Sequence, residues 1–108
     1  MEKKRFCFDI DNTICDTVGT LYHDSTPNYQ IIEIINTLYD NGHYIILHTA
    51  RGTLSKIEYE ALTRDQLAKW RVKYNELIMG KPAADIYIDD KAINVANIDF
   101  LGVLCGII

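Results

Sequence analysis

The sequence predicts a three-layer α/β fold, in which a parallel β-sheet carries helices on both faces. Short apolar runs alternate along the chain with segments whose apolar residues recur at helical spacing, as in proteins built from strand–helix–strand units. Acidic or polar residues directly follow the apolar runs, and parallel strands of such a sheet end at one common edge. The chain has 108 residues, enough for one domain with its own core. We therefore expect a single domain over residues 1–108.

The first predicted strand is Arg5–Asp9, a short apolar run that ends in an acid. Residues 14–25 are polar and irregular, with Gly19 in the middle, and they predict a loop or a small hairpin. A helix should follow. Thr26 is placed to cap its N-terminus, Pro27 to occupy its first position and Asn41-Gly42 to end it. Its apolar residues recur at helical spacing: Ile31, Ile34, Ile35 and Leu38.

Four further strands and two further helices complete the prediction. His43–Thr49 (HYIILHT) is nearly continuously apolar, which fits a strand buried on both faces. Glu76–Met79 predicts a short strand, Asp85–Asp89 (DIYID) a buried strand ending in acid, and Val103–Ile108 a last strand. The first further helix begins at Thr63–Gln66, which has capping-box spacing, and it carries Leu67, Trp70 and Tyr74 on one stripe. The second covers residues 91–100, with Ala92, Val95 and Ala96 facing inward.

The charge and cysteine content exclude several classes of protein. The net charge is −4, and the only basic cluster is Lys3-Lys4-Arg5, so we expect no nucleic-acid partner. The three cysteines are widely spaced and form no C-x-x-C pair, which favours reduced thiols in a cytoplasmic protein. The sequence shows neither a signal peptide nor an apolar run long enough to span a membrane, and we expect no membrane partner.

The polar residues at the predicted strand ends have the chemistry of a phosphoryl-binding site. They are Asp9 and Asp11 after the first strand, Thr49 after the second, Lys81 after the third, and Asp89-Asp90 after the fourth. Carboxylates gathered at one edge repel each other unless a cation lies among them, and all-oxygen ligation favours Mg²⁺ over Zn²⁺. Lys81 and Thr49 add a positive charge and a donor for phosphoryl oxygens. One aspartate would remain free to attack phosphorus.

In order along the chain, these residues resemble the four signature motifs of the haloacid dehalogenase superfamily. The resemblance runs from Asp9-Ile-Asp11-Asn-Thr13 through Thr49 and Lys81 to Asp89-Asp90. The stretches FDIDNTIC, TARG and GKPAADIYIDDKAIN are similar to small phosphatases linked to bacterial capsule or surface-polysaccharide biosynthesis. The resemblance implies a Rossmann-like fold and a magnesium-dependent phosphomonoesterase acting on a small phosphorylated metabolite, such as a sugar phosphate or a related glycan precursor.

The resemblance also implies a role for each matching residue. Asp9 would be the nucleophile that forms an aspartyl-phosphate, and Asp11 the general acid and then the base for water. An acid at position 11 favours rapid hydrolysis, since related ATP-driven pumps carry threonine there. Phosphate would be held by Thr49, Ala50, Arg51 and Lys81, and Mg²⁺ by Asp9, the backbone carbonyl of Asp11 and Asp89, with Asp90 direct or through water. For Arg51 two alternatives stay open: it binds the substrate, or it pairs with a surface acid.

The motif spacing implies that no cap domain covers the site. The residues between Asp9 and Thr49, and between Thr49 and Lys81, are already assigned to a loop, helices and strands. We expect an open site, covered by the 14–25 loop, by Arg51 and its neighbours, or by a second copy of the chain. The alternatives are a phosphotransferase, a receiver-like signalling module and an idle binding module. Motif order argues against the receiver, which carries its acidic pair after the first strand.

Overall fold

The computed structural model describes residues 2–98 of the chain. Its centre is a three-stranded parallel sheet in the order β1-β4-β5, formed by β1 (Arg5–Asp9), β4 (Tyr44–Thr49) and β5 (Glu76–Met79). All three are predicted strands, and the structure confirms them. The register pairs Asp9 with His48 and Thr49 with Met79, so the carboxyl ends of the strands meet at one edge.

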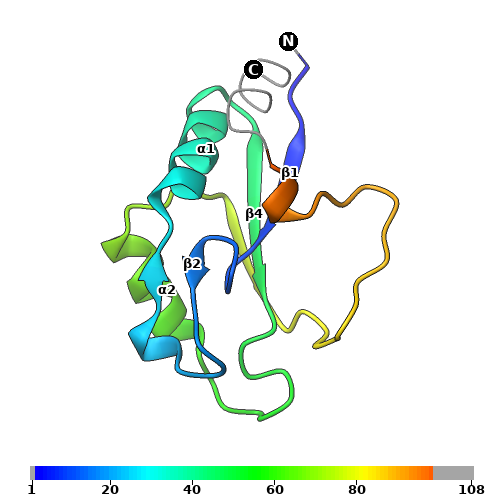
Figure 1. The fold of residues 1–108 in the computed structure, drawn as a ribbon. Helices are drawn as coiled ribbons and strands as arrows, with labels where there is room; N and C mark the ends of the chain where they lie inside the picture. The colour runs from blue at the N-terminus through cyan, green and yellow to red at the C-terminus, as the bar shows by residue number, and fades with distance from the viewer. Residues whose placement is uncertain (1, 99–108) are drawn as a thin grey trace.

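The two helices, α1 (Tyr29–Asp40) and α2 (Glu60–Lys69), lie on the same side of the sheet (Figure 1). The burial of β4 alternates accordingly: Ile45, Leu47 and Thr49 are buried, whereas the residues between them are half-buried. The α/β class is therefore confirmed. The prediction that β4 is buried on both faces is wrong, because the described helices cover only one face. The apolar side chains of α1 and α2 join β4 in a single core cluster.

Helix α1 begins later than the sequence predicts. Thr26-Pro27 form β3, which pairs antiparallel with β2 (Cys15–Asp16), and so neither residue belongs to the helix. The cap is Asn28, whose side chain accepts a hydrogen bond from the Ile31 N–H at 3.4 Å. The predicted end is confirmed: Asn41 is the C-cap, and Gly42 follows with φ 88°, a conformation that glycine adopts without strain. The predicted apolar stripe of α1 is buried.

Helix α2 begins earlier than the predicted capping box. Its N-cap is Tyr59, and Thr63 lies one turn inside, where its hydroxyl donates to the Tyr59 carbonyl at 2.7 Å. Thr63 and Gln66 are both buried and hold another side chain instead of capping the helix, so the capping-box prediction is wrong. The stripe behind them is nearly as predicted, since Leu67 and Trp70 are buried in the core.

Residues 80–94 form an extended segment without regular structure (Figure 1). The predicted strand Asp85–Asp89 is wrong, because these residues pair with no strand in the described chain, and Ile88 is 94% exposed. Of the predicted helix 91–100, the described part contains only the short 3-10 helix η2 (Val95–Asn97), from which Val95 packs against the core. The rest of that helix and the predicted strand 103–108 lie outside the described residues.

The connections between the strands are short, as the motif spacing predicts. Between β1 and β4 lie the β2–β3 hairpin, the 3-10 helix η1 (Tyr22–Asp24) and α1, and between β4 and β5 lies α2. Over the described part of the chain neither connection contains a cap domain. No helix among residues 2–98 has the length and apolar character needed to cross a membrane.

Candidate active site

An ion pair between Asp9 and Lys81 lies at the carboxyl edge of the sheet. The Lys81 Nζ is 3.3 Å from the Asp9 Oδ1, and the two side chains are 13% exposed for Lys81 and 34% exposed for Asp9. The Lys81 N–H donates to the Thr49 carbonyl at 2.9 Å, and its carbonyl accepts from the Thr53 hydroxyl at 2.8 Å. Both bonds fix the backbone of Lys81 beside the end of β4. The structure thus brings together three of the predicted residues, Asp9, Thr49 and Lys81.

Thr49 is the buried hydroxyl of this group. It is 0% exposed, and its Oγ1 accepts a hydrogen bond from the Arg51 N–H at 3.0 Å. No acceptor among residues 2–98 takes the hydroxyl proton of Thr49. Ala50 follows Thr49 directly and is half-buried.

A tight turn directs Asp11 away from the strand that precedes it. Asn12 has φ 62°, a left-handed conformation that asparagine tolerates better than most residues. Its N–H donates to the Cys15 carbonyl at 2.6 Å, and its side-chain oxygen accepts from the Thr17 N–H at 3.1 Å. The chain therefore folds back on itself, and the Asp11 carboxylate meets the hydroxyl of Thr17 at 2.7 Å.

The Arg51 side chain is buried in a bidentate pair with Asp11. Its Nη2 is 2.9 Å from Oδ1 and its Nε is 3.0 Å from Oδ2. The guanidinium is 0% exposed, whereas the Asp11 side chain is 21% exposed. Of the two alternatives for Arg51, the structure shows a pair with an acid, which is Asp11, and contact of Arg51 with a substrate stays a prediction.

Sequence reasoning did not find the residues that surround this pair. Arg51 Nη1 donates to the Gln66 side-chain oxygen at 2.6 Å and to the Thr63 hydroxyl at 3.1 Å, and its guanidinium lies over the Tyr22 ring at 4.8 Å from the centroid. The only sequence signal was two polar residues at i and i+3 on the face of α2 that also carries Leu67. That spacing led to the capping-box interpretation instead.

Three titratable groups near the site are neutral at neutral pH. Burial raises the pKa of Cys15, and the Asp11 charge adds to this effect. Burial also raises the pKa of Tyr22. Burial, followed by the charge of Lys81, lowers the pKa of His48. None of the three is therefore a charged partner for the pairs Asp9–Lys81 and Asp11–Arg51.

Asp89 and Asp90 do not join the other aspartates. They lie in the exposed 80–94 segment, where the Lys91 N–H donates to Asp89 Oδ1 at 2.8 Å and lowers the pKa of that carboxyl. Within residues 2–98, no three His, Cys, Asp or Glu side chains gather closely enough to hold a metal ion. The assignment of Asp9, the Asp11 carbonyl and Asp89 as magnesium ligands therefore stays a prediction.

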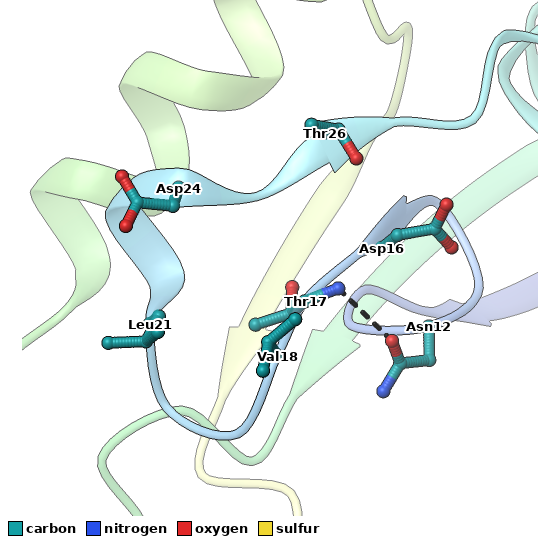
Figure 2. Close-up of a pocket in the computed structure, with 7 residues that line it drawn as sticks. All are labelled: Asn12, Asp16, Thr17, Val18, Leu21, Asp24 and Thr26. Carbon is teal, nitrogen blue, oxygen red and sulfur yellow. Dashed lines mark hydrogen bonds between the residues drawn. The ribbon is translucent and has the colours of Figure 1, made fainter.

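A hollow of about 270 Å³ lies beside the Asp11 turn, on the β2–β3 hairpin (Figure 2). Its wall includes Thr17, which touches Asp11, and Asn12, which follows it. The other lining residues are Asp16, Val18, Leu21, Asp24 and Thr26. The hollow thus has carboxylates and two exposed apolar side chains next to the predicted acid/base residue.

Comparisons with known proteins agree with this fold. A family model described as haloacid dehalogenase-like hydrolase matches residues 6–94. A crystal structure of a protein from Vibrio cholerae is similar over 94% of each chain, with a TM-score of 0.80 and 24% identity, which bears on the fold alone. A comparison with curated proteins found no match. Because the family model covers most of the sequence, including Asp9, Thr49 and Lys81, the chain belongs to the haloacid dehalogenase-like hydrolases.

Proposed function

We propose that this hydrolase is a phosphomonoesterase that acts on a small phosphorylated metabolite through an aspartyl-phosphate on Asp9. Membership of the family supports phosphatase-type activity in general. The observation that carries the proposal is the contact between Asp9 and Lys81 at the end of the sheet, where the Lys81 N–H is bonded to the Thr49 carbonyl. A partly exposed carboxylate with an ammonium at its side suits a nucleophile that receives a phosphoryl group.

The residues support a two-step reaction. In the first step an Asp9 carboxylate oxygen forms a bond to phosphorus, the bond from phosphorus to the ester oxygen breaks, and Asp11 gives that oxygen a proton. In the second step water attacks the phosphorus of the aspartyl-phosphate, Asp11 takes a proton from the water, and the bond from phosphorus to the Asp9 oxygen breaks, which releases inorganic phosphate and the free Asp9 carboxylate. Lys81 and Thr49 hold the phosphoryl oxygens in both steps.

The proposal includes a requirement for Mg²⁺. The family generally uses this ion, and carboxylate and carbonyl oxygens are its usual ligands. Asp9, the Asp11 carbonyl and Asp89 are the proposed ligands. Bound Mg²⁺ would neutralise charge on the phosphoryl oxygens. Its removal is a separate arm of the experiment below.

The proposed substrate is a sugar phosphate or a related precursor of a bacterial capsule or surface glycan. The similarity of the motif stretches to phosphatases of that metabolism supports this class, as does the partly exposed nucleophile. The proposal places the protein in the cytoplasm, with no nucleic-acid or membrane partner. A second copy of the chain is the proposed cover for the open site.

The test is phosphate release by the purified chain from a panel of sugar phosphates, amino-alcohol phosphates, nucleotides and an aryl phosphate. We expect release with Mg²⁺ and none with a chelator. Asp9→Asn should abolish release because an amide does not attack phosphorus. Asp40→Asn is the matched control, since Asp40 lies on the surface in a pair with Lys73, and it should retain full activity.

Different outcomes separate the parts of the proposal. Release by Asp9→Asn at a substantial rate would remove Asp9 as the nucleophile. Release that survives the chelator would remove the metal requirement and leave the esterase in place. If no ester is hydrolysed, the phosphatase proposal fails. Transfer of the phosphoryl group to an acceptor other than water would then be the next assay, because the exposed part of Asp9 admits such an acceptor.

A further inference from the structure

We propose that Arg51 is a positioning residue for the Asp11 carboxyl group and that it leaves Oδ2 as the oxygen that exchanges the catalytic proton. The inference rests on the proposed function of this site. It assigns to Arg51 no contact with the substrate. Arg51 instead decides which way the acid/base group faces.

The two oxygens of Asp11 have unequal surroundings. Oδ1 accepts from the Thr17 hydroxyl at 2.7 Å, from Arg51 Nη2 at 2.9 Å and from Arg51 Nε at 3.3 Å. Oδ2 accepts only from Arg51 Nε, at 3.0 Å, among the described residues. A carboxylate has about four acceptor positions over its two oxygens, so Oδ1 is saturated and Oδ2 keeps a free one. The free position is where a leaving group or a water molecule can meet Asp11.

Arg51 is itself held so firmly that it cannot turn to a substrate without losing several bonds. Gln66 and Thr63 of α2 accept from its Nη1 at 2.6 Å and 3.1 Å, and the Tyr22 ring lies against its guanidinium. The side chain is 0% exposed. Within residues 2–98, Asp11 is the only acid that pairs with it. Moving either side chain away would leave the charge of the other buried without a partner. This cost keeps the two side chains together.

Gln66 extends the same arrangement to the hairpin that walls the hollow. Its Nε2 donates to the Tyr22 carbonyl at 2.6 Å, while its Oε1 accepts from Arg51. The helix α2 therefore holds both Arg51 and the chain that leads from the hollow into η1. The planar fork of arginine is needed for this geometry, because a lysine ammonium would offer a single point charge in place of two parallel donors.

The experiment compares Arg51→Lys with wild type on two esters of different leaving groups, an alkyl phosphate and 4-nitrophenyl phosphate. An alkoxide needs a proton from Asp11 as it leaves, whereas 4-nitrophenolate does not. A misplaced general acid should therefore lower kcat/KM for the alkyl ester at least about 10-fold more than for the aryl ester, within the range of about 10²–10⁴ that general acid catalysis provides. Inhibition by inorganic phosphate should be unchanged.

Matched variants complete the design. Arg64→Lys is the control, because Arg64 lies on the exposed side of α2 in an i,i+4 pair with Glu60, and its activity should equal wild type. In an Asp11→Asn background, Arg51→Lys should lower kcat/KM for the alkyl ester little further, since the two residues act as one unit. Thr17→Val removes only one donor to Oδ1, so its loss of kcat/KM should be smaller but again greater for the alkyl ester than for the aryl ester. This variant replaces Arg51→Lys in the test if Arg51→Lys fails to fold.

Three outcomes would overturn the inference: equal losses on both esters, full additivity with Asp11→Asn, or weaker inhibition by phosphate. The last would make Arg51 a direct phosphate ligand. Denaturant unfolding of the same single and double variants tests the pair without any enzyme assay, and we expect the double variant to lose less than the sum of the single losses. If wild type hydrolyses nothing, the proposed function fails. Additive unfolding losses would then overturn the Arg51–Asp11 pairing independently.

Discussion

At the residue scale, Lys81 combines two tasks at the strand ends. Its ammonium lies 3.3 Å from Asp9, the proposed nucleophile, and its position suits a phosphoryl oxygen. Its ring contact with Tyr87, 4.1 Å from Nζ to the centroid, covers the ammonium on another side. The backbone of Lys81 is held by Thr49 and Thr53, so the side chain starts from a fixed point.

Lys81→Met should therefore lower kcat/KM for phosphomonoesters by about 10²–10³-fold, the loss typical of removing one donor from a developing anion. Methionine has similar length and no charge, so the fold should persist. Lys73→Met is the control, because Lys73 pairs with Asp40 on the surface. Steady-state kinetics on the best ester measures both variants. A Lys81→Met enzyme within a few-fold of wild type would show that Lys81 is not part of the machinery.

At the scale of elements, the loop after β4 positions two groups that the site needs. Residues 50–57 carry Arg51, and Thr53 in the same loop holds the carbonyl of Lys81. The loop closes through the Lys56 N–H, which donates to the Gly52 carbonyl at 2.9 Å. Gly52 has φ 78°, and a Cβ at this position would lie 2.1 Å from the carbonyl oxygen of Ile57. Both the left-handed backbone and the close approach of Ile57 therefore require glycine at position 52.

Gly52→Ala should lower the free energy of unfolding by more than the roughly 1–2 kcal/mol that a left-handed alanine alone costs, because the loop must also shift. Gly19→Ala isolates the backbone effect: Gly19 has φ 55°, and a Cβ added there would meet no atom within 4 Å. Urea unfolding of both variants gives the comparison. Equal losses would mean that the loop accommodates the methyl group freely, which would contradict the close approach of Ile57.

At the scale of the whole molecule, the described residues cover the sheet unequally. The core lies between the sheet and both helices, whereas the other face carries half-buried side chains such as Ile46 and His48. His48 lies opposite Asp9 in the register of the sheet. Burial and the charge of Lys81 lower the pKa of His48, and the charge of Asp9 partly opposes this.

The stability of the protein should therefore fall as the pH drops below about 6.5, the ordinary histidine pKa. In that range the unfolded chain binds a proton at His48 that the folded chain resists, so protonation favours unfolding. Above this pKa both states carry neutral His48 and the effect vanishes. Urea unfolding at pH 7.5 and pH 5.5 measures it. His48→Gln should lose less stability between these two pH values than wild type, and an identical loss would contradict the lowered pKa.

Local patterns were enough to predict the parallel sheet. Apolar runs identified β1, β4 and β5, and the stripe of α1 identified the helix that covers them, because burial on a sheet or helix face imposes a period that is visible in sequence. The residues at the strand ends predicted the meeting of Asp9, Thr49 and Lys81, since parallel strands bring their carboxyl ends together.

Long-range pairing decided the rest. The apolar run 85–89 has strand composition, but a strand also needs a partner edge, and it has none among the described residues. The partner of Arg51 depended on the turn at Asn12 and on the helix α2, which place residues 40 positions apart within hydrogen-bond distance. Spacing along the chain carries no record of such contacts. Short-range periodicity therefore determined the scaffold and the strand end that carries Asp9, whereas three-dimensional packing set the surroundings of the Asp11 carboxylate.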